Sequence, residues 1–146
     1  MLCLTAFVSG CSDDDKKDPE PSLFDIQLKK MAHTWTAAEV TLNGSDKTDD
    51  YDAFVLTLAG EEGELANTYT ASGRPAGSPW KAAGEWAFDF NGEVETKFQR
   101  DGGADAINIE YVVTEKTLQL TFAFAGDGYA AKTNDATGTW VFKFEK

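Results

Sequence analysis

Short runs of alternating apolar and polar residues, separated by turn signals, set the strongest constraint on what this chain can fold into. The runs are rich in β-branched and aromatic residues, and eight of them follow one another along the chain: 34–42, 51–59, 66–72, 84–90, 93–100, 106–113, 117–125 and 138–145. Regular short runs of this kind are typical of an all-β barrel or sandwich. No helical pattern lies between them, which argues against a parallel α/β sheet.

The turn residues indicate that neighbouring runs are joined as antiparallel hairpins. Asn91-Gly92 predicts a tight type I′ hairpin between the fourth and fifth runs. The sequences 101–103 and 114–116 supply the next two turns, and Asn43-Gly44 opens the first connection. We therefore expect an antiparallel up-and-down barrel of about eight strands, with a β-sandwich as the alternative.

Aromatic side chains at alternate positions predict which face of each run is buried. The fourth and eighth runs share the pattern Gly-x-Trp-x-Phe-x-Phe, beginning at Gly84 and Gly138. The rings expected in the core are Trp35, Trp86, Phe88, Phe90, Phe122, Phe124, Trp140, Phe142 and Phe144. Because a barrel of about eight strands is just wide enough for side chains or for one small ligand, these rings predict a solid lower barrel. Any ligand would then sit at the mouth.

One short helix is predicted before the first strand. Ser22 can cap it, and Asp25 stands three residues on, as in a capping box. Phe24, Leu28 and Met31 fall on one face of this helix. We expect that face to pack across one end of the barrel.

The first fifteen residues predict export and attachment to a membrane. Their short apolar run is too short to span a bilayer, which takes about 20 residues, but it suits a signal peptide. The run ends in Val8-Ser9-Gly10-Cys11, which resembles the bacterial lipoprotein box and implies that Cys11 is lipidated. The expected organisation is a signal peptide at 1–10, truncated or starting upstream, a lipidated cysteine with an acidic tether at 11–21, and the barrel domain at 22–146.

Several motifs together resemble the lipocalin-like lipoproteins of Bacteroidota. They are a first-strand tryptophan after a short helix (34–36), an Asn-Gly turn, a tyrosine-centred third strand (67–70) and a closing Gly-x-Trp-x-Phe strand. The resemblance implies a calyx-like barrel with one open end. The acidic triplet Asp13–Asp15 resembles the surface-export signal of the same bacteria, which implies an outward-facing protein anchored in the outer membrane. The alternative is a domain that faces the periplasm.

Composition argues against several classes of function. A net charge of −12 argues against nucleic acid, whose binding requires a basic face. His33 is the one histidine, and Cys3 and Cys11 belong to the leader and the anchor, so we expect neither nucleophilic catalysis nor an ordinary zinc site. The acidic residues within 46–52 lack the spacing of a calcium-binding loop. The expectation is a protein that is not an enzyme and carries no cofactor or metal.

The loop from Ser72 to Ala83 is the best candidate for a binding site. It places Trp80 outside any predicted strand, near Arg74 and Lys81. An exposed tryptophan beside cations can stack on a sugar ring or clamp an acidic or aromatic ligand. The alternative is a tryptophan folded back as a lid on the barrel end. Tyr129, in the loop 126–137, belongs to a second candidate rim.

Two functions follow from these features. The first is a lipid-anchored barrel that binds a small apolar or glycan-like ligand at its mouth, with Arg74, Trp80, Lys81 and Tyr129 as the candidate binding residues. The second is an accessory lipoprotein that docks on another envelope protein through an aromatic surface and holds no small ligand.

Overall fold

The computed structural model describes residues 18–89, 91–131 and 135–146 of the chain. Phe90, one of the expected core rings, lies outside the described residues, and so does Cys11, the expected site of lipidation. The predicted signal peptide and most of the predicted tether also fall outside them.

The described residues form a short helix followed by a series of strands. The elements in chain order are α1 (Leu23–Met31), β1 (Thr34–Leu42), β2 (Ser45–Asp46), the 3-10 helix η1 (Thr48–Tyr51), β3 (Val55–Ala59), β4 (Asn67–Ser72), β5 (Ala83–Phe88), β6 (Lys97–Arg100), the 3-10 helix η2 (Gly103–Asp105), β7 (Ile107–Val113), β8 (Thr117–Phe124) and β9 (Gly138–Glu145). Each predicted run overlaps one of the longer strands, β5 begins one residue before its run, and β2 is an additional strand of two residues.

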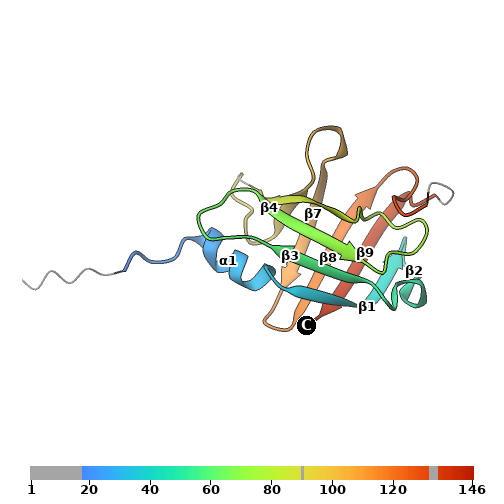
Figure 1. Cartoon of the computed structure of the whole chain (residues 1–146), viewed down its shortest axis with the longest axis horizontal. Coiled ribbons are helices and arrows are strands. Elements are labelled where there is room, and N and C mark those ends of the chain that lie inside the picture. The colour runs from blue at the N-terminus through green and yellow to red at the C-terminus, as the bar shows by residue number, and fades with distance from the viewer. Residues whose placement is uncertain (1–17, 90, 132–134) are drawn as a thin grey trace, which may run out of the picture.

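Antiparallel pairing closes the sheet into a barrel (Figure 1). The strands pair in the order β1-β3-β4-β5-β6-β7-β8-β9, and β9 returns to β1 with a register from Thr36↔Glu145 to Leu42↔Trp140. The extra strand β2 pairs with the end of β1 through the hairpin at Asn43 and Gly44, whose φ angles are 51° and 78°. Positive φ at both positions is what a type I′ turn requires. The predicted up-and-down barrel is confirmed, and the sandwich alternative is wrong because all strands belong to one closed sheet.

The helix α1 packs across one end of this barrel, as predicted (Figure 1). Ser22 caps this helix: the Asp25 amide donates to Ser22 Oγ at 3.2 Å, and Ser22 Oγ donates to Asp25 Oδ2 at 2.7 Å. Met31 is fully buried, and its carbonyl accepts the indole N–H of Trp35 at 2.9 Å. The helix is therefore fixed to the start of β1, and it leaves the opposite end of the barrel to the connecting loops.

Aromatic rings fill the barrel interior. The expected core rings that the structure describes are all 8% exposed or less: Trp35, Trp86, Phe88, Phe122, Phe124, Trp140, Phe142 and Phe144. Phe142 is the centre of the group, and the rings whose centroids lie within 6.1 Å of its own are Tyr51, Phe54, Trp80, Phe122, Trp140 and Phe144. The prediction that these rings face inward is confirmed for the described residues.

The tight hairpin predicted at Asn91-Gly92 is wrong. Strand β5 ends at Phe88 and β6 begins at Lys97, so a longer connection joins them. Val94 in this connection is 5% exposed, and its carbonyl accepts a hydrogen bond from the Tyr111 hydroxyl. Because Val94 is buried against the barrel end, this connection does not continue the pairing of β5 with β6. The burial of Val94 thus outweighs the preference of Asn91-Gly92 for a tight turn.

Candidate functional site

A loop plugs the barrel at the end opposite α1. The loop, residues 73–82, joins the end of β4 to the start of β5 and contains neither helix nor strand. Trp80 in this loop is fully buried inside the barrel. The rings that surround its own at centroid distances of 5.5 to 6.3 Å are Phe54, Tyr69, Phe122 and Phe142.

The interpretation of Trp80 as an exposed stacking platform is therefore wrong, and the alternative of a ring folded back into the barrel end is confirmed. Indole carries a large apolar surface whose burial is favourable, and the barrel end offers it a wall of other rings. Polar contacts hold the loop in this position. Arg74 Nη1 donates to the Trp80 carbonyl at 3.0 Å, and the Trp80 amide donates to Ser78 Oγ at 3.3 Å.

The indole N–H distinguishes Trp80 from the other three tryptophans. Trp35, Trp86 and Trp140 each donate to a backbone carbonyl, at 2.9, 3.0 and 2.8 Å. Trp80 Nε1 is buried without an acceptor among the residues that the structure describes. Leaving a buried donor unpaired costs about 1–3 kcal/mol. The position of Trp80 is thus stabilised by ring contacts and destabilised by its one polar atom.

Arg100, in β6, lies directly against this tryptophan. Its guanidinium carbon is 4.5 Å from the centre of the Trp80 ring and 5.5 Å from that of Phe122, and the side chain is fully buried. Within the described part of the chain, Nε, Nη1 and Nη2 make no hydrogen bond. The nearest ion pair joins Nε to Asp101 Oδ2 at 3.4 Å. Burial away from water lowers the pKa of Arg100, and the negative charge of Asp101 opposes that shift.

A charge inside a ring-lined barrel is costly unless it is well paired. Two cation–π contacts offset part of this cost, at about 2 kcal/mol each when desolvated. Sequence reasoning missed Arg100, although a signal was present: Phe98 and Arg100 are two residues apart on one strand, so their side chains share the inward face.

Asp101 connects the buried arginine to the rim of the barrel. Its carboxylate accepts the Tyr69 hydroxyl at 3.1 and 3.2 Å, and Lys81 Nζ lies 3.9 Å from Oδ2. A Cβ on Gly84 would stand 2.2 Å from Asp101 Oδ1 and 2.6 Å from the Tyr69 ring, so this position requires glycine. One carboxylate is thus shared by a phenol and two cations.

The rim also contains Lys81 and Tyr129. Lys81 Nζ donates to Asp105 Oδ2 at 2.9 Å, and this hydrogen bond raises the pKa of Lys81. The same Nζ lies 5.4 Å from the centre of the Tyr129 ring. The structure therefore brings Arg74, Trp80, Lys81 and Tyr129 to one end of the barrel, as the sequence suggests, but around a buried tryptophan rather than an exposed one.

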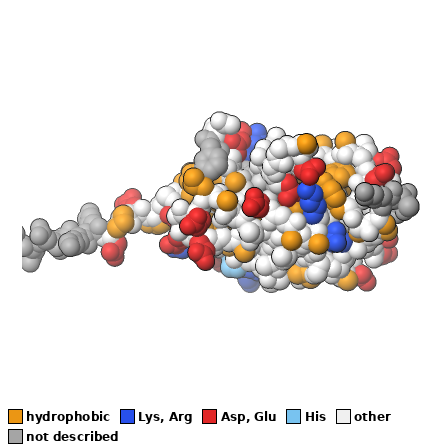
Figure 2. Space-filling model, turned by 45° about the horizontal axis from the view of Figure 1, so that its top comes forward, with side chains coloured by type: hydrophobic (Ala, Val, Ile, Leu, Met, Phe, Trp, Pro, Cys, Tyr) orange, Lys and Arg blue, Asp and Glu red, His pale blue; other side chains and the backbone are white. Residues whose placement is uncertain are grey.

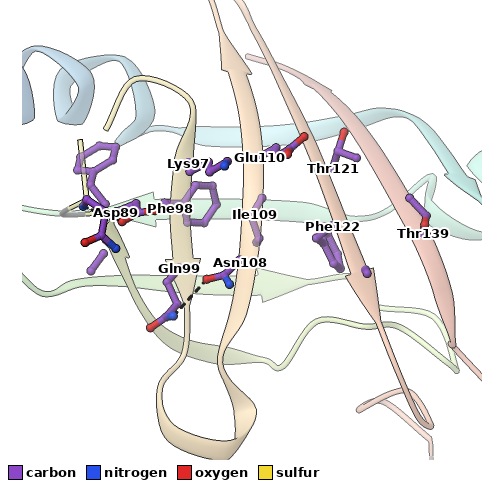
Figure 3. A pocket seen from close by; sticks show the side chains of 14 residues that line it. Asp89, Lys97, Phe98, Gln99, Asn108, Ile109, Glu110, Thr121, Phe122 and Thr139 are labelled. Carbon is purple, nitrogen blue, oxygen red and sulfur yellow. Dashed lines mark hydrogen bonds between the residues drawn. The ribbon is translucent and has the colours of Figure 1, made fainter. Parts of the chain in front are cut away.

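Among the hollows on the described surface that lie away from this end, two are of interest, one on the sheet and one beside α1. The larger, of about 730 Å³, is on the outer face of β5 to β9, where side chains of Lys97, Gln99, Asn108 and Glu110 surround smaller ones (Figure 3). Gln99 Nε2 donates to Asn108 Oδ1 there at 3.2 Å. The smaller, of about 160 Å³, lies between α1 and the loop before β4 and is lined in part by Phe24, Leu28, Leu65 and Phe88.

The described residues do not expose an aromatic docking face of the kind that the sequence suggests. Of the large apolar side chains that are exposed in the described residues, Tyr129 is the one aromatic, at 37% exposure. Acidic side chains are spread over the face in Figure 2, and hydrophobic ones lie among them in small groups. The large hollow in Figure 3 is lined mainly by polar side chains.

Within residues 18–89, 91–131 and 135–146, no group of three or more His, Cys, Asp or Glu side chains is placed to hold a metal ion. Over the same residues, no helix has the length and apolar character needed to cross a bilayer. Comparison of the chain with protein families, with curated proteins and with solved structures finds no match.

Proposed function

We propose that this protein is a lipid-anchored envelope protein whose barrel binds one small ligand, apolar or glycan-like, in the end that the loop 73–82 plugs. The observation that carries this proposal is the position of Trp80. A loop side chain, rather than a strand side chain, occupies the interior there, and the structure describes no acceptor for its indole N–H. A barrel of about eight strands holds either side chains or one small ligand. Trp80 therefore occupies the place that a ligand would take.

The walls around Trp80 indicate what would replace it. Tyr69 and Phe122 present their rings to the indole nearly at right angles, with interplanar angles of 80° and 87°. A planar ring of similar size would make the same edge-to-face contacts. We therefore favour a ligand with one ring, either aromatic or a sugar with an apolar face.

Displacement of Trp80 requires the loop to give up a small set of polar contacts. Besides the contacts of Trp80 itself, the Tyr129 amide donates to the Ser78 carbonyl at 2.8 Å, and the Ala71 amide donates to the Ala82 carbonyl at 2.8 Å. The second of these lies at the base of the loop, beside β4. Its tip can withdraw without breaking a pair of the β4–β5 ladder, which ends at Thr70↔Ala83.

Mass spectrometry of the full chain, purified from its own membrane, tests ligand binding directly. We expect a small molecule that dissociates from the wild-type protein and is absent from Trp80→Arg, in which a charged side chain disturbs the plug. Phe88→Leu, at a buried ring that contacts Phe24 and Trp86 near α1, serves as a control for general loss of packing. If the same mass is absent from wild type, and a library of ring-bearing metabolites and sugars leaves the Trp80 fluorescence unchanged, the proposal is wrong.

The anchor rests on the sequence of residues 8–15 and has its own test. Cells that express the full chain are fed a clickable palmitate, and label on wild type but not on Cys11→Ser supports lipidation. Digestion of intact cells by an added protease then separates the outer face from the periplasmic one. An unlabelled wild-type protein in the soluble fraction would contradict the anchor without affecting ligand binding.

Docking on another envelope protein is the second candidate, and the hollow of about 730 Å³ on β5 to β9 favours it. A photo-crosslinking residue at Ala123, on the floor of this hollow, is expected to give one discrete product in the native membrane. The matched position is Thr36, on β1 and outside the residues that line the hollow. Equal labelling from both positions, or none, contradicts docking at this face.

A further inference from the structure

The plugged end of the barrel holds an excess of buried hydrogen-bond donors. Arg100 Nη1, Arg100 Nη2 and Trp80 Nε1 all lack an acceptor among the described residues, and each atom is shielded from solvent. The guanidinium faces the indole at 4.5 Å, so these donors belong to one small region. Buried polar groups are paired in most proteins. A group of unpaired donors with a full positive charge indicates that an acceptor is missing.

The protein's own carboxylate does not supply that acceptor. Asp101 approaches Arg100 through Nε, at 3.4 Å, and the same carboxylate accepts the Tyr69 hydroxyl and lies 3.9 Å from Lys81 Nζ. Its position is fixed from the other side by the close approach of Gly84. Nη1 and Nη2, which form the fork that matches a carboxylate, have no acceptor among the described residues.

We propose that the ligand of this end is a small aromatic acid, whose carboxylate pairs with Nη1 and Nη2 of Arg100 while its ring takes the place of the Trp80 indole. This inference rests on the proposed function, since it names the chemical class of the ligand bound there. The ring of the ligand contacts Tyr69 and Phe122, and the carboxylate meets the donors that the free protein leaves unpaired. Lys81 lies at the rim of the same end, where its Nζ pairs with Asp105 at 2.9 Å.

The charge of Arg100 discriminates against the other ligand classes. A cationic amine of the same size would meet a buried guanidinium of like charge. A neutral sugar or amide offers acceptors but no charge, so it leaves the buried charge of Arg100 uncompensated, and it lacks the paired oxygens of a carboxylate that match the guanidinium fork. The account therefore requires that a neutral isostere bind much more weakly than the acid.

Calorimetric titration of the full chain in detergent, with indole-3-acetate and with its neutral isostere indole-3-acetamide, tests this requirement. We expect the wild-type protein to bind the acid at least about tenfold more tightly than the amide. Arg100→Met removes the charge inside the barrel and is expected to reduce affinity for the acid to that for the amide. Lys143→Met removes a charge on the outer face, where Lys143 Nζ pairs with Glu39 at 2.8 Å, and is expected to leave the ratio unchanged.

The possible outcomes distinguish the acidic-ligand inference from the proposed binding function. If acid and amide bind wild type equally, the acidic-ligand inference is wrong, whereas the proposed binding function stands. If neither binds, the inference is wrong, and the function then depends on the molecule that co-purifies. The comparison of acid with amide on wild type decides the matter even if Arg100→Met does not fold.

Discussion

The guanidinium of Arg100 and the indole of Trp80 face each other at 4.5 Å inside the barrel, one from a strand and the other from a loop. Each residue buries donors for which the described structure offers no acceptor. The two are therefore held together by ring stacking and cation–π attraction rather than by hydrogen bonds. Under the proposed function, this contact lets one loop side chain seal the barrel and yields to a molecule that pairs with the arginine.

Removal of the buried charge is expected to stabilise the free protein. Arg100→Met fills a similar volume with an apolar chain and removes a buried guanidinium that makes no hydrogen bond to the described residues. Asp101 loses the 3.4 Å ion pair but keeps the Tyr69 hydroxyl and Lys81 as partners. Urea unfolding should show a higher midpoint for Arg100→Met than for wild type. Lys143→Met, which removes an exposed charge, should stay within about 0.5 kcal/mol of wild type. A large loss of stability in Arg100→Met would show that the guanidinium is well paired in solution.

The four indole N–H groups are expected to differ in energetic value. Trp140→Phe removes a hydrogen bond of 2.8 Å to the Ala136 carbonyl, whereas Trp80→Phe removes a donor that has no acceptor among the described residues. Both changes replace indole by a smaller ring. We expect Trp80→Phe to cost less free energy of unfolding than Trp140→Phe, by about 1 kcal/mol or more. Equal costs in urea unfolding would contradict the assignment of Trp80 as unpaired.

Phe142 is expected to be among the most important residues for stability. It is fully buried, and its ring centroid lies 5.1 Å from that of Tyr51 and 5.5 Å from that of Phe54. Phe142→Ala should lower the free energy of unfolding by about 3–5 kcal/mol, because it leaves a cavity in the ring-filled core. Val112→Ala is the matched control, since that side chain is 64% exposed and its truncation should cost no more than about 0.5 kcal/mol. Similar losses at both sites would contradict the described core.

Stability is expected to fall at alkaline pH. Burial raises the pKa of Tyr51 to about 12 and also raises the pKa values of Tyr69 and Tyr111. Because a tyrosine in the unfolded chain titrates near pH 10, the stability that these neutral phenols contribute is full below about pH 10. It is lost as the pH rises through about 12.

Unfolding in urea as a function of pH, followed together with tyrosinate absorbance, checks this. The unfolding midpoint should begin to fall near pH 10, and Tyr51→Phe should make the fall shallower. Titration of all the tyrosines near pH 10 in a protein that remains folded would contradict their burial.

The strand pattern and the helix cap were predictable from the sequence, because both depend on local spacing. Alternation in 138–145 places Trp140 and Phe142 on one face whatever the rest of the chain does, and Ser22 finds Asp25 within one turn. The hairpin at Asn91-Gly92 was not predictable in this way, since the burial of Val94 by a distant part of the barrel decides that connection.

The candidate site, too, was predictable from the sequence only in part. Its loop could be located from the sequence, because Trp80 stands among glycine and proline residues outside any alternating run. The burial of Trp80 could not be predicted, because the space that receives its indole is formed by Tyr69, Phe122 and Phe142, which come from three separate strands. Arg100 was hidden for a related reason: an isolated arginine in a strand is usually on the solvated face.

The most direct test of ligand binding by displacement of Trp80 is the ¹H–¹⁵N spectrum of the four indole N–H groups during titration with indole-3-acetate. The Trp80 signal is identified as the one missing from Trp80→Phe. The account predicts that this signal alone moves strongly and begins to exchange rapidly with water at saturation, while those of Trp35 and Trp86 stay in place. Binding of the acid with the Trp80 signal unmoved and still protected, or no binding at all, would contradict the account.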